Sequence, residues 1–321
     1  MNILGINISH NASIALYSDG KIKQYYEEDR FNKIKNWHPI PELGIKNGVL
    51  NNTYQSFKKI NDTIDYVIYS SFRNKYESQF IINTIQNQLN NPRYYFNENN
   101  HHIYHAVSGY HFSKFDEAIC IVVDGGGSSP FNTFHHEIES IFFIDRNKIE
   151  TYYQHLSNFK YDPNRYGVLT KNTQEKIVKD NTEYLLSNTN GSGNFFSLAC
   201  EISGLNSLDA GKLMGLSCYS VHDKRFSTLS LKLAKVAQEY LYDNIVSLIE
   251  KAIDKYPVKN IVLSGGCALN CLNNFKYVKK FTNLNFFIDP VPHDGGTSIG
   301  AAIYYNDYYR SEEHTSELQS H

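Results

Sequence analysis

The chain has 321 residues, 41% of them hydrophobic and 20% charged, with a formal net charge of -2 at pH 7. This length can bury a substantial core and fits one large or two medium domains. The near-neutral charge disfavours a nucleic-acid partner, and no apolar run approaches the length that spans a membrane. Five cysteines, mostly within apolar segments, favour free thiols in a reducing cytosol, so we expect a cytoplasmic protein.

The two ends of the sequence predict different features. Met1 is followed at once by an apolar run that predicts a strand, which leaves no room for a signal peptide. The last twelve residues, 310–321, resemble the translation of a sequencing-library adapter, so we expect a non-native tail there. On this interpretation the natural protein continues past Tyr309 and the sequence is a fragment.

The hydrophobic pattern of the first third predicts both strands and helices. The expected elements are strands over 2–9, 14–17, 22–26 and 66–70, and helices over 42–60, 79–89 and about 101–112. Asp19 and Gly20 supply the hairpin turn between the second and third strands.

The rest of the chain repeats this order. Strands are expected over 119–123, 138–145 and 149–153, again with a small-residue turn after the first and a hairpin before the last. A polar insertion follows over 156–190, with a helix over 173–186. The remaining expected elements are helices over 194–204 and 229–256, a glycine-bearing turn over 211–216, strands over 260–263 and 286–288, a helix opening after 264–270, and a helix over 297–305.

The repeated order predicts an α/β protein with a duplicated ribonuclease-H-like fold, of the actin and sugar-kinase type, in two lobes around a central cleft. We expect the first lobe over 1–116 and the second over 117–309. The second lobe contains the insertion near 156–190, and the tail over 310–321 is excluded.

Two histidines and two aspartates predict a metal site. His101 and His105 are four residues apart and therefore share one face of their helix, although such a pair also arises by chance among 13 histidines. Asp124 ends a buried apolar strand, where an uncompensated carboxylate is costly, and Asp294 opens a glycine turn. This donor set suits a divalent ion with open positions, such as iron, manganese or zinc.

Glycine turns follow several of the predicted strands. Gly125 and Gly126 come after the strand over 119–123, and Gly266 comes after the strand over 260–263. Backbone amides in such turns can approach a phosphate, so the turns together favour a nucleotide ligand. Each turn alone is equally explained by the conformational freedom that a tight turn requires.

Side chains near the N-terminus have two interpretations each. His10, in the first turn, could accept a proton from a hydroxyl group or could only hydrogen-bond to backbone. Lys35, like Arg30, could meet a phosphate or carbamoyl oxygen or could belong to a solvated charged face. The residues alone leave these alternatives open.

Seven motifs, in family order, resemble the carbamoyltransferases of antibiotic and nodulation-factor biosynthesis over essentially all of residues 1–309. They are Gly5 to Ala15, Glu28 to Lys35, His101-His102-x-x-His105-Ala106, Val123-Asp124-Gly125, Gly211-Lys212-x-Met214-Gly215-Leu216, Ser264-Gly265-Gly266-x-Ala268-x-Asn270, and Pro292-x-Asp294-x-Gly296-x-x-x-Gly300-Ala301-Ala302.

The resemblance implies a two-domain enzyme. Its N-terminal domain is similar to the universal tRNA threonylcarbamoyl-transfer protein and binds an iron ion and carbamoyl-adenylate between two lobes. A C-terminal domain, which we expect to be missing from this sequence, would make that intermediate from carbamoyl phosphate and ATP. The first domain would then pass the carbamoyl group to a hydroxyl of a small-molecule acceptor, and a homodimer is left open.

The resemblance also implies a role for each matching residue. The metal, iron(II) or another divalent ion, would be bound by His101, His105, Asp124 and Asp294. The base would be His10, and the acyl-adenylate would be contacted by Lys35, with Asp124, Gly125 and Gly126 at its phosphate. The nucleotide side would be formed by Gly266 and Asn270, and the adenosine pocket by Asp209, Gly211 and Lys212.

The sequence departs from the family pattern at two positions. Asn11 stands where many relatives have Asp, and Asn36 stands where a second cation is usual. We therefore expect an O-carbamoyltransferase fragment and keep two alternatives. One is a tRNA threonylcarbamoyl-type transferase, which would depend on tRNA, and the other is a non-catalytic ATP-binding module of the actin and sugar-kinase class, which would lack the metal.

Overall fold

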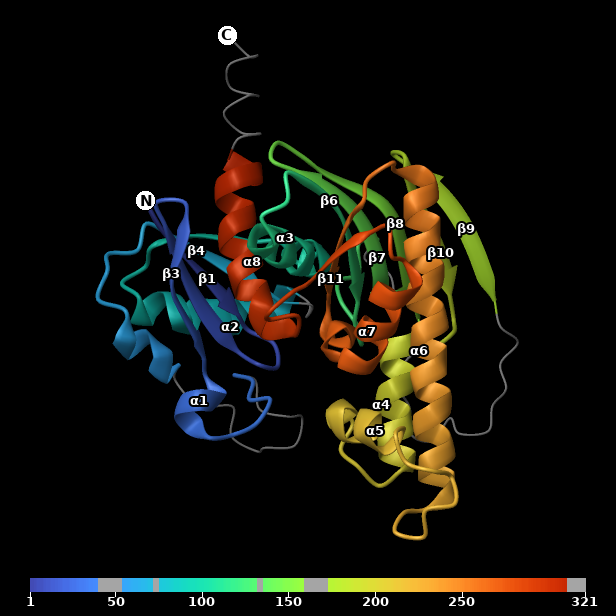
Figure 1. Ribbon diagram of the computed structural model, residues 1–321. Coiled ribbons are helices and arrows are strands. Elements are labelled where there is room, and N and C mark those ends of the chain that lie inside the picture. Colours follow the sequence, from blue (N-terminus) through green and yellow to red (C-terminus); the bar gives the residue numbers. More distant parts are fainter. Residues whose placement is uncertain (40–53, 72–74, 132–134, 159–172, 311–321) are drawn as a thin grey trace.

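Two mixed β-sheets with a pair of helices between them form the protein in the computed structural model (Figure 1). The structure describes residues 1–39, 54–71, 75–131, 135–158 and 173–310. No helix among these residues is long and apolar enough to cross a membrane.

The first sheet has the strand order β3-β2-β1-β4-β5. Its strands are β1 (Asn2–Asn7), β2 (Ser13–Ser18), β3 (Lys21–Glu27), β4 (Tyr66–Ser70) and β5 (Arg93–Phe96). The first three are antiparallel, and β4 and β5 continue parallel to β1. Because β1 is central and covered on both faces, its side chains read as a nearly continuous apolar run.

The second sheet contains the same arrangement, in the order β12-β11-β6-β7-β8-β10-β9. Its strands are β6 (Glu117–Val123), β7 (His136–Asp145), β8 (Ile149–Ser157), β9 (Gln174–Lys179), β10 (Thr182–Ser187), β11 (Asn260–Ser264) and β12 (Asn285–Ile288). β6, β7 and β8 are antiparallel, and β11 and β12 are parallel to β6. The repeat expected from the sequence is therefore present in the fold.

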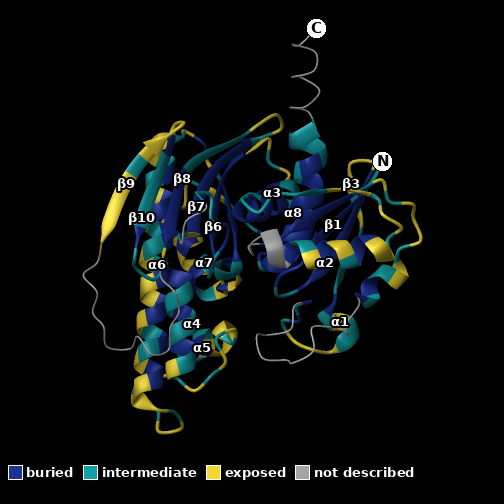
Figure 2. Ribbon diagram, turned by 180° about the vertical axis from the view of Figure 1, so that it is seen from behind, coloured by how far each residue is buried: buried dark blue, intermediate teal, exposed yellow. Residues whose placement is uncertain are grey.

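The helices form three layers around these sheets. They are α1 (Asp29–Asn32), α2 (Lys75–Gln88), α3 (His101–Ser113), α4 (Ser192–Ile202), α5 (Ala210–Leu216), α6 (Thr228–Lys255), α7 (Cys271–Lys280) and α8 (Thr297–Tyr304). Hydrophobic side chains of α2 pack on the outer face of the first sheet, and those of α6 pack on the outer face of the second. Figure 2 shows the buried residues concentrated in the strands and in α3 and α8, while α6 alternates between buried and exposed.

α3 and α8 each pack on the sheet that is formed by the other half of the chain. α3 precedes the second sheet in sequence but packs on β6, β7 and β11, whereas α8 follows that sheet and packs on β1, β2 and β4. The two helices also pack on each other. A Cβ on Gly300 of α8 would lie 1.8 Å from the carbonyl oxygen of Tyr104 on α3, so glycine permits this close approach.

Two expected elements of the second half are wrong. The expected helix over 173–186 is the hairpin β9-β10, because Asp180 and Asn181 both adopt positive φ and form the turn between two antiparallel strands. The expected glycine turn over 211–216 is helix α5. Strand β5 was not expected, and most of the expected helix over 42–60 lies outside the described residues, as does the tail over 311–321.

Candidate metal centre

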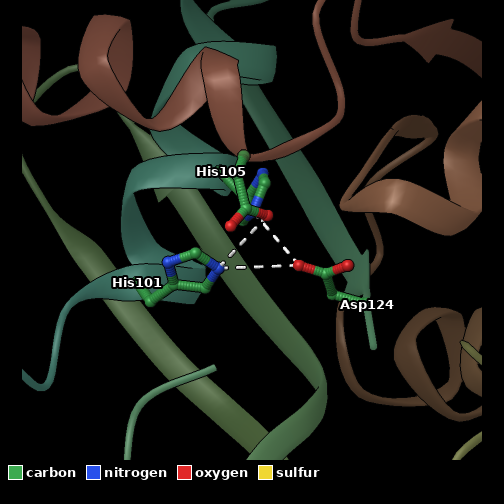
Figure 3. A group of neighbouring side chains, drawn as sticks. His101, His105 and Asp124 are labelled. Atoms are coloured by element: carbon green, nitrogen blue, oxygen red, sulfur yellow. Dashed lines mark ion pairs between the residues drawn. The ribbon is translucent and has the colours of Figure 1, made fainter. Parts of the chain in front are cut away.

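The two histidines of the predicted metal site lie in the first turns of α3. His101 and His105 are fully buried, and their ring centroids are 4.8 Å apart. Their spacing of four residues places both Nε2 atoms on the same side of the helix, as expected. Figure 3 shows both imidazoles directed toward Asp124.

The two aspartates reach the same point from other elements. Asp124 follows β6 and is 8% exposed, and Asp294, after β12, is 1% exposed. Oδ2 of Asp124 lies 3.5 Å from Nε2 of His101 and 3.4 Å from that of His105, and Oδ1 of Asp294 lies 3.8 Å from each. The four side chains can offer ligand atoms that all lie within 4.8 Å of one another.

Charge pairing offsets the cost of burying this group. Burial alone would raise the pKa of Asp124, but His101 and His105 hold that pKa well below its usual range. Burial also opposes ionisation of Asp294, while His10 and His101 lower its pKa to about 2. Burial lowers the pKa of His105, but the two carboxylates outweigh it and raise this pKa to about 10.

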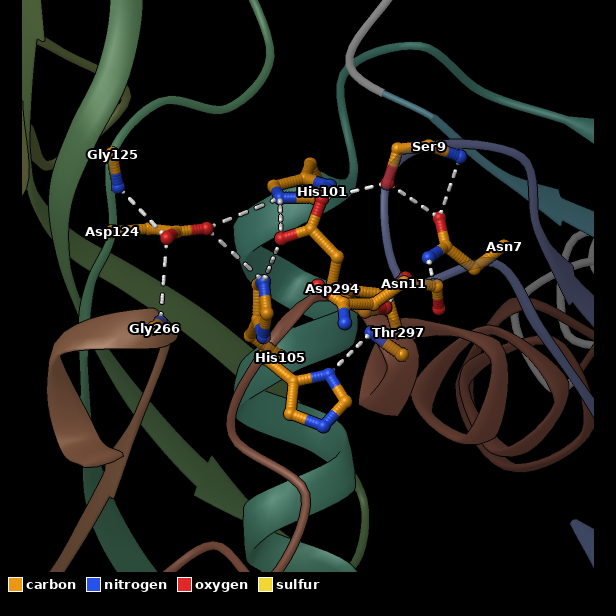
Figure 4. Close-up of polar contacts among 12 residues, drawn as sticks. Asn7, Ser9, Asn11, His101, His105, Asp124, Gly125, Gly266, Asp294 and Thr297 are labelled. Carbon is orange, nitrogen blue, oxygen red and sulfur yellow. Dashed lines mark hydrogen bonds and ion pairs between the residues drawn. The ribbon is translucent and has the colours of Figure 1, made fainter. Parts of the chain in front are cut away.

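Each aspartate uses its second oxygen for a hydrogen bond that fixes its orientation (Figure 4). Oδ1 of Asp124 accepts from the amides of Gly125 at 2.7 Å and Gly266 at 3.3 Å. Oδ2 of Asp294 accepts from the hydroxyl of Ser9 at 2.6 Å, and the amide of Ser9 donates to Asn7 at 3.0 Å. One oxygen of each carboxylate is therefore anchored, and the other faces the histidines.

The four residues fit a divalent ion. Ligands about 2.1 Å from one ion in a tetrahedron stand about 3.4 Å apart, which is close to the shorter nitrogen–oxygen separations here. These separations exceed the usual hydrogen-bond length, so the polar atoms surround a point instead of bonding tightly to one another. Two imidazoles and two carboxylates in a buried site are a donor set typical of iron, manganese or zinc.

His10 lies beside the four converging side chains. Its Nε2 lies 3.3 Å from Oδ2 of Asp294, its Nδ1 lies 2.9 Å from Oδ1 of Asn11, and its side chain is 32% exposed. Burial lowers the pKa of His10, but Asp294 and Asn11 more than offset it, and the pKa is raised above 6.5. Asn11, at the position that departs from the family pattern, therefore orients the ring, and its Nδ2 donates to Asn36, the other departure.

Three charged residues expected near the nucleotide meet across the two halves of the chain. Nζ of Lys35, after α1, lies 3.0 Å from Oδ1 of Asp209, which precedes α5, and Nζ of Lys212 lies 2.7 Å from Oδ2. These lysines hold the pKa of Asp209 at about 2. Both ammonium groups are mostly exposed, so this is a surface ion cluster that joins the first lobe to the second.

The other expected nucleotide residues differ in their surroundings. The Gly125 and Gly266 amides donate to Asp124 instead of facing an open space. Asn270 caps α7 by accepting from the amide of Asn273 at 3.1 Å. Gly126 and Gly211 have no atom within 4 Å of where a Cβ would be.

Sequence reasoning missed three residues that shape the centre. Ser9, which follows β1, donates to Asp294, and Asn7 at the end of β1 accepts from Ser9. A Cβ on Gly193 would lie 2.6 Å from the carbonyl oxygen of Asp124. In the sequence, the only signal for Ser9 was its position next to His10. The only signal for the close approach of residue 193 to Asp124 was the pair of glycines at 191 and 193.

Comparison with known proteins gives one family match and several distant relatives. The sequence model described as "Carbamoyltransferase N-terminus" matches residues 220–303. Uncharacterized protein MJ1051 of Methanocaldococcus jannaschii is 26% identical over 94% of this chain and 56% of its own length. Nodulation protein NolNO of Sinorhizobium fredii is 22% identical over 92% of this chain and 46% of its own length. The chain thus spans about half the length of the curated relatives it matches.

Solved structures support the fold. T. kodakarensis HypF superposes with a TM-score of 0.60 at 13% identity, over 97% of this chain and 48% of HypF. A ROK family protein from Streptococcus pneumoniae gives a TM-score of 0.50 at 13% identity, over 98% of this chain and all of that one. The duplicated ribonuclease-H-like fold of the sugar-kinase and actin type is confirmed. The family match over 220–303 and the nodulation-protein relative show that this chain is similar to the carbamoyltransferases, the family that its motifs resemble.

Proposed function

We propose that this chain is the transfer domain of a metal-dependent O-carbamoyltransferase, which moves a carbamoyl group from carbamoyl-adenylate to a hydroxyl of a small metabolite or sugar. The observation that carries the proposal is the buried convergence of His101, His105, Asp124 and Asp294 beside the half-exposed His10. The family match and the curated relatives support carbamoyl transfer in general.

The four converging side chains would hold iron(II) or another divalent ion. Such an ion acts as a Lewis acid toward a carbonyl oxygen and stabilises negative charge that develops there. One oxygen of Asp124 and one of Asp294 accept hydrogen bonds from the chain, and these bonds would orient the other oxygens for this role.

His10 is the residue best placed to accept the proton of the acceptor hydroxyl. Its ring stands at the border between the buried centre and solvent, and Asn11 fixes the ring by accepting from Nδ1. In the transfer step the hydroxyl loses its proton to Nε2 and its oxygen bonds to the carbamoyl carbon. The bond from that carbon to the phosphate oxygen breaks, and AMP leaves.

Lys35 and Lys212 are proposed to attract the adenylate. They approach from different lobes and share Asp209, so a phosphate arriving there would compete with one carboxylate for two ammonium groups. Gly125, Gly126 and Gly266 would approach the phosphate from the turns around Asp124. Carbamoyl phosphate and ATP would be used by a further domain, as the greater length of the relatives suggests.

Metal content and transfer activity test the proposal together. Anaerobically purified chain should contain about one iron or equivalent divalent ion, and His101→Ala/His105→Ala should lose it. His111→Ala is the matched control, because His111 lies on the same helix outside the centre and should leave the metal in place. Loaded chain should release AMP from carbamoyl-adenylate only with a hydroxylated acceptor.

Two results would contradict the proposal. A folded wild-type chain without stoichiometric metal would move the assignment to a nucleotide-binding module. Transfer that requires tRNA, and fails with sugars and other small hydroxylated acceptors, would move it to the tRNA-modification branch.

A further inference from the structure

Two buried glutamates on β7 face opposite sides of the second sheet because of a β-bulge between them. Glu137 is opposite Leu156 on β8, whereas Glu139 is opposite His155, so the register shifts by one residue. Residues two apart on a regular strand share a face, but a bulge re-aims one of them. Glu137 accordingly bonds to Gln154 and Glu139 to His155, which are neighbours on β8.

The side chain of Glu137 lies on the face of the second sheet against which α3 packs. Its carboxyl group is fully buried, and Oε2 accepts from the amide of Ser128 at 3.0 Å. The backbone of Ser128 also accepts from the amide of Glu137 at 2.8 Å, so the two residues are joined twice. The hydroxyl of Ser128 in turn accepts from the amide of His101 at 3.1 Å. A continuous chain of hydrogen bonds therefore runs from β7 to the first residue of α3.

α3 needs such a partner at its N-terminus. The first amides of a helix have no partner within the helix, and a side chain of the N-cap residue usually accepts from one of them. Asn100 occupies the N-cap position but makes no capping bond with its side chain. Ser128, from the turn after β6, supplies the acceptor instead.

Close packing leaves this cap little freedom. A Cβ on Gly127 would lie 2.9 Å from Oε2 of Glu137 and 2.9 Å from Nε2 of His102. Only glycine fits between these two side chains without displacing them. The first turn of α3, which contains His101 and precedes His105, therefore packs tightly against Ser128 and Glu137, which form the cap.

We propose that Glu137 and Ser128 are positioning residues for the metal centre, which orient the two histidines by capping α3 from the second sheet. The inference rests on the proposed metal site and adds the cap that sets its geometry. The cap acts as a hydrogen-bond acceptor, so Glu137→Gln should preserve it. Burial raises the pKa of Glu137 to about 8, which agrees with a role that does not need its charge.

Cobalt(II) titration followed by visible absorption tests the cap on the whole chain. Ser128→Ala removes the acceptor of the His101 amide, and Glu137→Leu removes the acceptor of the Ser128 amide. Each should weaken cobalt binding roughly 10- to 100-fold and alter the absorption bands, as loss of supporting contacts does at other metal sites. Glu137→Gln should restore both the affinity and the bands.

Glu139→Leu is the matched control. Glu139 is as buried as Glu137 and lies two residues away, but it bonds to His155 and to Asn244 of α6 on the other face. It should lower stability about as much as Glu137→Leu while leaving cobalt binding unchanged. Should Glu137→Leu fail to fold, the milder Ser128→Ala against wild type still decides the question.

Hydrogen exchange of the metal-free chain separates failure of the cap from failure of the metal site. Ser128→Ala should speed exchange of the amides at the start of α3, about residues 101–104, and not of those near its end. Wild-type affinity and bands in Ser128→Ala, or unchanged exchange at the start of α3, would overturn the cap. A wild-type chain that binds no cobalt would overturn the metal site, and faster exchange in Ser128→Ala would then still support the cap.

Discussion

Nε2 of His10 lies 3.3 Å from Oδ2 of Asp294, so the predicted base touches a predicted metal ligand. The other oxygen of the same carboxylate faces the histidine pair of α3. The protonation of His10 and the charge at the metal centre are therefore linked through one aspartate.

A base function of His10 predicts transfer that accelerates with rising pH. Burial lowers the pKa of His10, but Asp294 and Asn11 raise it above 6.5 overall, so the ring keeps its proton to a higher pH than a free imidazole. The rate should fall as pH drops through that raised pKa, because a protonated ring cannot accept a proton. His10→Gln should lower kcat roughly 100- to 10,000-fold and flatten the acidic limb, measured as kcat against pH. An unchanged acidic limb in His10→Gln would assign the titration to another group.

Metal binding should release protons and tighten as pH rises. The two carboxylates raise the pKa of His105 to about 10 against the opposing effect of burial, so its imidazole is protonated in the metal-free chain at neutral pH. A metal binds only the neutral ring, so affinity should rise about tenfold per pH unit for one released proton. Calorimetric titrations with cobalt(II) in two buffers of different ionisation enthalpy measure that proton. Equal binding heats in the two buffers and a pH-independent affinity would contradict a protonated His105 beside the two carboxylates.

The cluster around Asp209 predicts opposite effects of two kinds of substitution. Lys212 and Lys35 lower the pKa of Asp209 to about 2, so the carboxylate is ionised and screens both cations at neutral pH. Asp209→Asn should tighten AMP binding by about fivefold or less at low salt, whereas Lys35→Ala and Lys212→Ala should weaken it. Fluorescence titration with labelled AMP measures all three. Weaker binding in Asp209→Asn would instead place Asp209 against the nucleoside.

Gly300→Ala should disturb both stability and the metal centre. The added Cβ would stand 1.8 Å from the carbonyl oxygen of Tyr104, so α8 must move away from the helix that carries the histidine pair. Overpacking of this kind costs about 1–3 kcal/mol or more, which urea denaturation measures. Gly211→Ala on α5 is the control, because open space surrounds that position and alanine favours the helix. Equal stability of the two variants would mean that α3 and α8 adjust freely.

Local patterns in the sequence were sufficient for the repeat and for the four side chains that converge in the candidate metal site. The spacing of His101 and His105 predicts a shared helix face because the α-helix has a period of 3.6 residues. Asp124 follows an uninterrupted apolar run, which predicts a carboxylate at the end of a buried strand. The order of strands and turns predicted the duplicated fold, since hairpins and apolar runs are local features.

Local patterns failed where pairing partners decide the structure. Residues 174–187 have no strong period of their own, and pairing of β10 with β8 makes them strands. The turn residues Asp180 and Asn181 are the local signal of the hairpin, whereas the lysines and glutamates on either side are helix formers. Segments of this kind take the structure that their neighbours in space favour.

The sequence by itself determined which side chains could bind a metal and on which elements they lie. Only the tertiary structure decided what holds them in place. Ser9 and Asp294 are 285 residues apart, and the face taken by Glu137 depends on a bulge defined by its partner strand. Such contacts form when the two sheets close on α3 and α8, and a hydrogen bond between distant residues leaves no periodic trace in the chain.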